Sequence, residues 1–365
     1  MPDNRKTPPR GWNLTVIRAR PALKLLPMDP TGSIDWSEVD IAQIDTGYTE
    51  HPVFGDFVAG ETHLNIHAGR NFRDGETLND PRDPINYSGL GTLPGHGTHT
   101  GSLLCGNKIA GKFDGGVAPG LPLIPYRVAN TGIIGWPAGT KRDRLHVAQA
   151  IMHAVDENDV DAINMSMGIP WLSPFGSRPL GNAVDYAYEH GVIICAAAGQ
   201  VIDRVTYPGK FYRTIGCGGI DPDKTMWNNI DQGYSEFDLI HIDTWAPANH
   251  INRPTVTLDE EGKLQTDIYA NNGSGTSYAT AHVTAAAAMW LVYHREAIAL
   301  LYGHKPWMRI EAFRQLLKQT AKTMSGDQRP YPGTGILDIK ALLEAELPQP
   351  GGLNKEERLA ANMWA

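Results

Sequence analysis

Cysteine is scarce in this 365-residue chain, which argues against a fold held together by disulfide bonds. The three cysteines, Cys105, Cys195 and Cys217, are odd in number and lie in apolar stretches that we expect to be buried. A disulfide framework needs paired cysteines and an oxidising compartment. The sequence therefore favours a reducing compartment.

Blocks of positive charge and long apolar runs are missing as well. The formal net charge is −8 and no cluster of lysine and arginine is present, so we do not expect nucleic acid as a partner. No run of about 18 apolar residues could span a membrane. Residues 1–6 are polar, and the apolar stretch of a signal peptide does not follow them. We therefore expect a cytoplasmic protein that does not enter the membrane.

The rest of the chain alternates between short apolar segments typical of strands and longer segments with helical spacing of apolar residues. We predict strands within residues 38–44, 123–128, 160–168, 192–199, 213–218 and 238–246, and helices within residues 144–157, 183–189, 279–292, 308–323 and 336–346. This alternation indicates an α/β fold with a mostly parallel central sheet and helices on both faces.

The domain organisation follows from the lack of internal repeats and clear linkers. We expect one domain over residues 31–347. Residues 1–30 form an arm that is too rich in proline and polar residues to build its own core. Residues 348–365 read as a polar C-terminal tail.

A glycine-containing turn at residues 272–276 leads into Ser277 and then into an alanine-rich segment long enough for a buried helix. A hydroxyl at a helix N-terminus lies beside free N–H groups and the positive end of the helix dipole, which favour negative charge. Ser277 is therefore either a helix cap, the common role of such a serine, or a nucleophile whose substrate becomes an oxyanion.

Two other glycine-containing turns carry side chains suited to catalysis. Asp45 ends the first predicted strand and precedes a Thr-Gly pair, a usual place for function in an α/β sheet, although such an aspartate can also only form a turn. His96 and His99 stand where a helix should begin, and a metal site there would need a third ligand that the sequence does not supply. We expect one histidine to be exposed as a base and the other to turn inward.

Residues 60–95 are rich in Gly, Asn, Asp and Pro, and we expect them to be mainly loop. Acids within residues 73–76 and 79–83 could supply oxygen ligands to calcium. No regular ligand spacing is present, however, so the pattern favours solvated acids.

Asp45, His96 and Ser277 occur in this order along the chain, each in one of the turns. The turns are Asp45-Thr46-Gly47, His96-Gly97-Thr98-His99 and Gly275-Thr276-Ser277-Tyr278-Ala279. With these motifs, residues 38–343 resemble the subtilisin-like serine proteases. Further segments match the family in the right order: Gly116-Val117-Ala118-Pro119, Asn164-Met165-Ser166-Met167-Gly168, Ala196-Ala197-Ala198-Gly199, Tyr207-Pro208-Gly209 and Trp245-Ala246-Pro247.

The resemblance implies a three-layer subtilisin-like fold and a serine endopeptidase that cleaves protein or peptide substrates. It implies that Ser277 attacks the peptide carbonyl, that His96 transfers the proton and that Asp45 orients His96, as in subtilisin. The Ser277 N–H would be one oxyanion donor. The substrate walls would be Ser166, Met167, Gly168, Ala197, Ala198 and Gly199. The chemistry requires no cofactor, and the family allows a structural calcium ion.

Three departures from the family pattern bear on function. Gln200 stands where the family usually has Asn as the side-chain donor to the oxyanion. Its longer side chain either still donates or points to solvent. Loss of such a donor lowers turnover by about 100- to 1,000-fold. Ala281 replaces a usual Pro, for which we expect little effect. We expect no long N-terminal prodomain, and we expect residues 1–30, which include Leu25-Leu26-Pro27-Met28, to form either an inhibitory arm across the cleft or a disordered tail.

Two alternatives to a general protease stay open. A pseudoenzyme that binds a peptide or partner protein is favoured by Gln200 and opposed by the intact Asp45, His96 and Ser277. A processing protease dedicated to one partner protein would carry identical motifs. The pocket sequence favours apolar or aromatic substrate side chains, and Trp171 and Phe175 in a predicted loop would narrow access to it.

Overall fold

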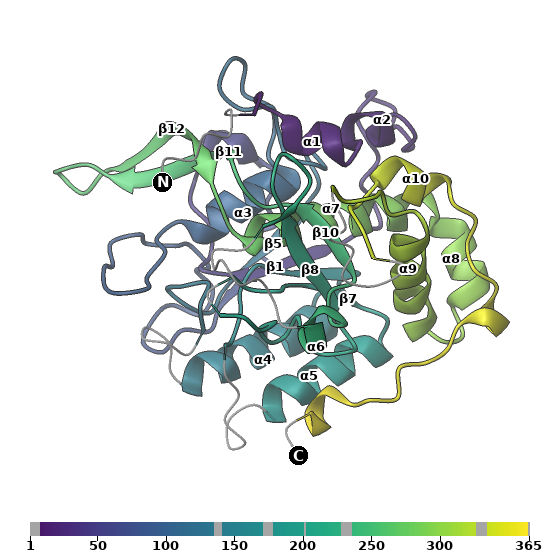
Figure 1. The fold of residues 1–365 in the computed structure, drawn as a ribbon. Helices are drawn as coiled ribbons and strands as arrows, with labels where there is room; N and C mark the ends of the chain where they lie inside the picture. The colour runs from purple at the N-terminus through teal and green to yellow at the C-terminus, as the bar shows by residue number, and fades with distance from the viewer. Residues whose placement is uncertain are drawn as a thin grey trace.

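The computed structural model describes residues 8–134, 141–170, 178–200, 202–227, 236–325 and 334–363, built around one central sheet (Figure 1). The strand order is β10-β8-β7-β6-β1-β5-β4, with β9 beside β8. Its strands are β1 (Ile41–Asp45), β4 (Arg70–Asn71), β5 (Leu123–Arg127), β6 (Ala162–Met165), β7 (Ile193–Ala197), β8 (Ile215–Ile220), β9 (Met226–Trp227) and β10 (Thr244–Pro247). Neighbours along the order are parallel, whereas β9 runs antiparallel to β8. The predicted α/β class is confirmed.

Strand residues alternate between two apolar cores, one on each face of the sheet. In β1, Ile41 packs with the core that contains α3 and α7, whereas Ala42 packs with the core that contains α4 and α5. In β7 the same alternation separates Ile193 from Ile194. The helices are α3 (His96–Cys105), α4 (Lys141–Asp156), α5 (Arg178–Glu189), α6 (Glu236–Leu239), α7 (Thr276–Tyr293), α8 (Arg295–Tyr302), α9 (Trp307–Gln319) and α10 (Ile339–Glu344).

Helix α7 is buried along nearly its whole length because its residues are apolar or small on every side. The few hydroxyls find partners inside the protein: Thr284 Oγ1 donates to Asn164 Oδ1 at 3.0 Å, and Thr280 Oγ1 donates to Thr276 O at 2.9 Å. The helix packs against β6, β7, β8 and β10. None of the helices in the described ranges is long and apolar enough to cross a membrane.

The N-terminal arm differs from both of its expected forms. Its described part contains the short helices α1 (Trp12–Val16) and α2 (Ala19–Leu23), which pack into the core beside α7 and α10. Asn13 Nδ2 lies 2.9 Å from His282 Nε2, and Ile17 is completely buried. No described residue of the arm lines the cleft cavity. The arm adds apolar surface to the main core, which neither a disordered tail nor an extension across the cleft would do.

The predicted polar tail also packs against the domain. It forms two 3-10 turns, η2 (Pro350–Gly352) and η3 (Ala360–Asn362). Ala360 is fully buried, and its N–H donates to Asp185 Oδ1 at 2.8 Å. Gly181 allows this approach, because a Cβ there would lie 2.6 Å from the Cα of Ala361.

One predicted strand is shorter than expected, and one hairpin was not predicted. Within residues 238–246 only the end is a strand, because the N–H of His241 and the N–H of Ile242 bond to carbonyls three residues back and form a turn. Beyond β10, β11 (Ile251–Leu258) and β12 (Leu264–Gly273) form an antiparallel hairpin that projects from the domain (Figure 1). A smaller pair, β2 (Gly55–Asp56) and β3 (Glu61–Thr62), follows the turn η1 (Pro52–Phe54). Cys105, Cys195 and Cys217 are buried, free thiols.

Candidate active site

The end of β1 brings Asp45 against the first residue of α3. Asp45 is fully buried, and its Oδ1 accepts from the N–H of Thr46 at 2.7 Å. His96 Nδ1 lies 2.7 Å from the same oxygen. Because the carboxylate accepts, Nδ1 of His96 carries the proton and Nε2 is left as the basic nitrogen. The pair has the geometry of an aspartate that fixes the tautomer of a histidine.

Glycine permits this close approach of α3 to the end of β1. A Cβ at Gly97 would lie 2.0 Å from the carbonyl oxygen of Gly47, so no other residue fits without moving the backbone. Two polar contacts then fix the helix: the N–H of Gly97 donates to Thr46 Oγ1 at 3.0 Å, and Gln43 Nε2 donates to Gly97 O at 2.7 Å. The sequence motif around His96 is thus a packing requirement as well as a chemical one.

Ser277 lies in the first turn of α7, as the sequence predicts. Its Oγ donates to the carbonyl oxygen of Ser166 at 2.9 Å, and Ser166 Oγ donates to the Ser277 carbonyl at 2.8 Å. The two serines therefore tie α7 to the end of β6. Ser166 is fully buried and is not among the residues that line the cavity near Ser277.

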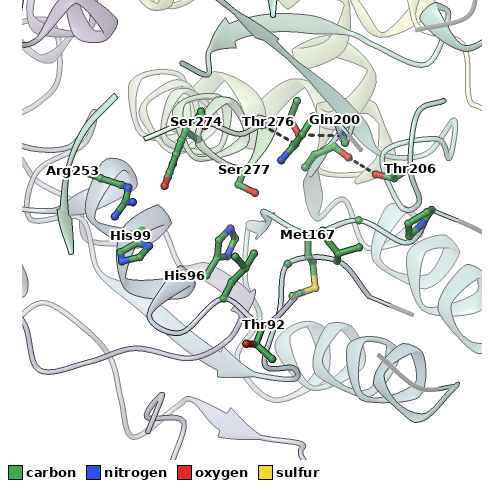
Figure 2. A pocket seen from close by; sticks show the side chains of 18 of the residues that line it. Thr92, His96, His99, Met167, Gln200, Thr206, Arg253, Ser274, Thr276 and Ser277 are labelled. Carbon is green, nitrogen blue, oxygen red and sulfur yellow. Dashed lines mark hydrogen bonds between the residues drawn. The ribbon is translucent and has the colours of Figure 1, made fainter. Parts of the chain in front are cut away.

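Gly132 marks the space that His96 and Ser277 share. A Cβ at this glycine would lie 3.4 Å from His96 Nε2 and 3.4 Å from the Ser166 carbonyl that holds the Ser277 hydroxyl. The basic nitrogen and the hydroxyl thus border the same small volume, although the hydroxyl bonds to Ser166 in this state. Figure 2 shows Ser277 above His96 across this space.

Gln200 is anchored by its carbonyl oxygen. Oε1 accepts from the N–H of Thr276 at 3.2 Å and from Thr276 Oγ1 at 2.8 Å (Figure 2). Because a backbone N–H can only donate, the atom that faces it is the oxygen, which leaves Nε2 free to point elsewhere. A Cβ built on Gly275 would lie 3.6 Å from Gln200 Nε2 and 3.7 Å from the Ser277 nitrogen. Two potential donors therefore border one space beside Gly275.

A cavity of about 470 Å³ joins these groups. Of the six substrate walls expected from the sequence, Met167, Gly168, Ala197 and Gly199 line it, together with Gln200. Ala198 is fully buried and, like Ser166, is not among the lining residues. Residues 171–177, which contain the predicted aromatic loop with Trp171 and Phe175, lie outside the described residues.

The histidine pair differs from its expected arrangement. His96, the expected base, is 7% exposed, so it is not the exposed member of the pair. His99 is half-buried and lines the cavity, and its Nε2 lies 3.3 Å from Thr255 Oγ1 of the hairpin. Burial, with the nearby charge of Arg253, holds the pKa of His99 well below its usual value, so its imidazole is neutral at pH 7.

The acids proposed for calcium are bound to arginine instead. Glu76 accepts from Arg127 Nε at 2.7 Å and from Arg73 Nε at 2.9 Å, and Asp80 accepts from Arg82. Within the described ranges, no group of three or more His, Cys, Asp or Glu residues could hold a metal ion. These carboxylates do not fit a calcium site, and calcium binding by this chain stays a prediction.

An aspartate, a histidine and a serine at the ends of elements around a parallel sheet are the residue types that serine hydrolases of several unrelated folds use for catalysis. The family follows from comparison with known proteins. The model of the subtilase family matches residues 37–336, and the chain belongs to that family. It is a serine peptidase family, so the coarse assignment from the sequence motifs is confirmed.

Individual relatives are distant in sequence. Subtilisin DY of Bacillus licheniformis is 27% identical over 314 residues, 84% of this chain and 90% of its own length. The major intracellular serine protease of Bacillus subtilis is 27% identical over 301 residues, 79% of each chain. Among solved structures, MycP1 without its N-terminal propeptide has a TM-score of 0.61 at 19% identity, covering 93% of this chain and 98% of its own. A protease of Pseudoalteromonas arctica has a TM-score of 0.66 at 21% identity, covering 92% and 98%. These structures support the fold.

Proposed function

We propose that this protein is a serine endopeptidase that hydrolyses peptide bonds through an acyl-enzyme on Ser277. The observation that carries the proposal is the 2.7 Å contact between Asp45 and His96 beside a serine at the N-terminus of α7. The hydroxyl would turn from the Ser166 carbonyl toward His96 Nε2 when substrate binds. Such contacts are commonly loose before substrate arrives.

The reaction uses these groups in two halves. Ser277 Oγ attacks the scissile carbonyl carbon while His96 Nε2 takes its proton, and Asp45 stabilises the resulting imidazolium. The tetrahedral intermediate collapses, the C–N bond breaks and His96 gives the proton to the leaving amine. Water then attacks the ester, His96 takes one proton from it, and Ser277 leaves as the alkoxide that recovers the proton.

Gln200 serves as the side-chain donor to the oxyanion. The two bonds from Thr276 fix its carbonyl oxygen and leave Nε2 at the space beside Gly275 that the Ser277 nitrogen also borders, which supports donation over the alternative in which the side chain points to solvent. Donors held in place before the charge develops stabilise the transition state at no reorganisation cost. The side chain of Gln is one methylene longer than that of Asn, and the bonds from Thr276 hold this longer side chain in place.

Active-site labelling tests the nucleophile. A fluorophosphonate probe should label wild-type protein stoichiometrically, and mass spectrometry should locate the adduct on Ser277. Ser277→Ala should abolish the adduct, whereas Ser274→Ala, which removes a neighbouring hydroxyl that lines the cavity, should keep it. Correctly folded wild-type protein that takes no label would reject the hydrolase and favour a pseudoenzyme.

A nearly isosteric substitution, Gln200→Glu, tests whether Gln200 donates to the oxyanion. Gln200→Glu keeps an oxygen for both bonds from Thr276 but replaces the donating Nε2 by a second oxygen. We expect turnover of peptide substrates to fall about 100- to 1,000-fold, with a small change in KM. An equal turnover in Gln200→Glu would show that Gln200 does not donate.

A digest of a peptide library would distinguish a protease that cleaves many sequences from a processing enzyme dedicated to one partner protein.

A further inference from the structure

Arg253 of β11 enters the same cavity as Ser277, and two of its three guanidinium nitrogens lack a hydrogen-bond partner. Its Nε and Nη1 are shielded from solvent, and neither makes a hydrogen bond to any residue that the structure describes. No aspartate or glutamate is among the residues that line the cavity. Guanidinium nitrogens that are shielded from water and make no hydrogen bond are costly, because they lose hydration without gaining an acceptor. Such a group is suited to a ligand that supplies the missing acceptors.

Arg253 is held in place by packing. Its Cζ lies 5.9 Å from the centre of the Tyr278 ring, the residue directly after Ser277. Its stem runs past Gly273, where an added Cβ would lie 3.2 Å from Arg253 Cδ and 3.1 Å from Tyr278 Cε2. The missing side chain of Gly273 therefore makes room for the arginine. The guanidinium is aimed by apolar and aromatic contacts, which do not satisfy its N–H groups.

The position of Arg253 relative to the reacting atoms assigns it to one half of the substrate. Gln200 and Arg253 lie on opposite sides of Ser277 in Figure 2, and His99 lies beneath Arg253. The carbonyl oxygen of the substrate faces Gln200. His96 must lie next to the leaving amine to protonate it, and α3 carries His96 and His99 on this same side. Arg253 therefore faces residues that follow the scissile bond.

Electrostatics support a negative ligand at this place. Arg253 is the one fixed charge among the described residues that line the cavity, since His99 is neutral at pH 7. A planar guanidinium with free N–H groups matches the two oxygens of a carboxylate in a bidentate contact. The cavity thus combines a neutral acyl side with a cationic leaving-group side.

We propose that Arg253 is a specificity-determining residue that binds a carboxylate on the leaving half of the substrate. The inference rests on the proposed peptidase function and names part of its substrate class. The carboxylate belongs either to an acidic side chain just after the scissile bond or to the free C-terminus of a short leaving peptide. Both sources present the same two oxygens to Arg253.

Paired peptide substrates test this preference. Internally quenched peptides would share one acyl half with Phe before the scissile bond, and would carry Asp or the isosteric Asn at the first or second position after it. A second series would end two residues after the bond in a free carboxylate or an amide. We expect kcat/KM to be about 10- to 100-fold higher for the carboxylate in one series, because a hydrogen-bonded charge contributes on that scale. The series with the larger ratio identifies the source.

Substitutions assign the preference to Arg253. Arg253→Met should reduce the ratio to near one, and Arg253→Glu should reverse it in favour of Lys at the responsive position, a gain that misfolding cannot produce. Lys263→Met is the matched control, because it removes a positive charge from the exposed end of the same hairpin. It should keep the wild-type ratio. Equal rates for both members of every pair, or a ratio that survives in Arg253→Met, would overturn the proposal.

Binding separates this inference from the peptidase reaction. The same peptides would be titrated into the Ser277→Ala protein, where affinity does not depend on turnover. Tighter binding of the carboxylate peptide, lost on adding Arg253→Met, supports the carboxylate site even if wild-type protein takes no fluorophosphonate. Labelled wild-type protein with no carboxylate preference in rate or affinity rejects the role of Arg253 alone.

Discussion

Arg127 and Arg253 are both strand arginines near the cleft, but their surroundings differ. Arg127 is fully buried, and all five of its N–H groups have acceptors: Glu76 twice, the carbonyls of Thr46 and Ala129, and Asn130. Arg253 has two nitrogens shielded from water without acceptors. The comparison separates a cation that holds the fold from one that is left for a ligand. A buried cation whose N–H groups all bond to the chain is structural, whereas one with unbonded N–H groups beside Ser277 is the group that we propose for a ligand.

The structural role of Arg127 follows from what it connects. It bonds to Thr46, the residue after Asp45, and lies 3.8 Å from Asp83. Asp83 in turn accepts from the N–H of Gly95, the residue before His96. One buried network therefore reaches the backbone beside both Asp45 and His96.

The largest effect is expected when this network loses its cation. Arg127→Met should lower the free energy of unfolding by about 3 kcal/mol or more, because it leaves two carboxylates and two carbonyls near the core without their partner. Urea denaturation followed by circular dichroism measures the change. Arg253→Met should change stability by less than about 0.5 kcal/mol, since no hydrogen bond is lost. Equal losses in the two variants would break the comparison.

Acid should lower stability by protonating a partner of Arg127, whereas Arg253 should not contribute to this pH dependence. Burial opposes ionisation of Glu76, but hydrogen bonds from Arg127 and Asn71 outweigh it and lower its pKa to about 2. Because folding lowers this pKa, its stabilisation is complete above about pH 4.5 and is lost as the pH falls toward 2. We expect the ionised Glu76 carboxylate to contribute about 1 kcal/mol to the free energy of unfolding, a value kept small because the carboxyl is partly exposed.

Denaturation curves at pH 6 and pH 3 measure this acid effect. Glu76→Gln should remove that part of the pH dependence, and Arg253→Met should leave it intact. A Glu76→Gln protein that loses stability with acid as steeply as wild type would contradict the assignment.

Substitution of Gly273 should reduce the carboxylate preference by less than substitution of Arg253 itself. Gly273→Ala places a Cβ against Ile251 O, Tyr278 and Arg253, which should displace the guanidinium. We expect the preference for a carboxylate leaving group to fall about three- to tenfold, because a displacement of this kind weakens but does not remove the contact. Kinetics with the paired peptides measure it. The adjacent Ser274→Ala should keep the ratio, and an undiminished ratio in Gly273→Ala would contradict the packing argument.

Salt should give the smallest effect and the clearest contrast in solvent access. Raising sodium chloride from about 0.05 to 0.5 M should lower the carboxylate preference by about twofold, because ions screen the attraction between Arg253 and a carboxylate that arrives from solvent. The Arg127→Met stability loss should stay the same over this range, since that network is buried. A salt-insensitive preference would mean that substrate closes the cavity over Arg253.

Sequence reasoning proposed the candidate site residues, of which the structure brings Asp45 and His96 into contact, but it did not predict their surroundings. Asp45, His96 and Ser277 stand in glycine-containing turns whose spacing reflects local backbone needs, as at Gly97 against Gly47. The parallel sheet followed from strands that are apolar on both faces. These signals are local, and local signals survive without an alignment.

The missed features depend on contacts between distant segments. The β11–β12 hairpin is an exception, because its contacts are local: Val256 and Leu258 alternate with Thr255 and Thr257, but Pro254 interrupts the run and argues against a strand. The role of the bonds from Thr276 to Gln200 required knowing that two segments 76 residues apart meet. The sequence predicts an arm without a core for the segment of helix α1, because the residues that cover it lie near the other end of the chain.

That last placement has a consequence for how the protein is made. Asn13 meets His282 across 269 residues, and Arg18 meets Asp338 across 320. During synthesis the N-terminal helices emerge long before α7 and α10 exist, so Trp12 and Ile17 have nothing to cover them. Contacts this distant in sequence close late and slow the final step of folding. Helix α7, which carries Ser277, and the arm that packs behind it are therefore completed together, only when almost the entire polypeptide has left the ribosome.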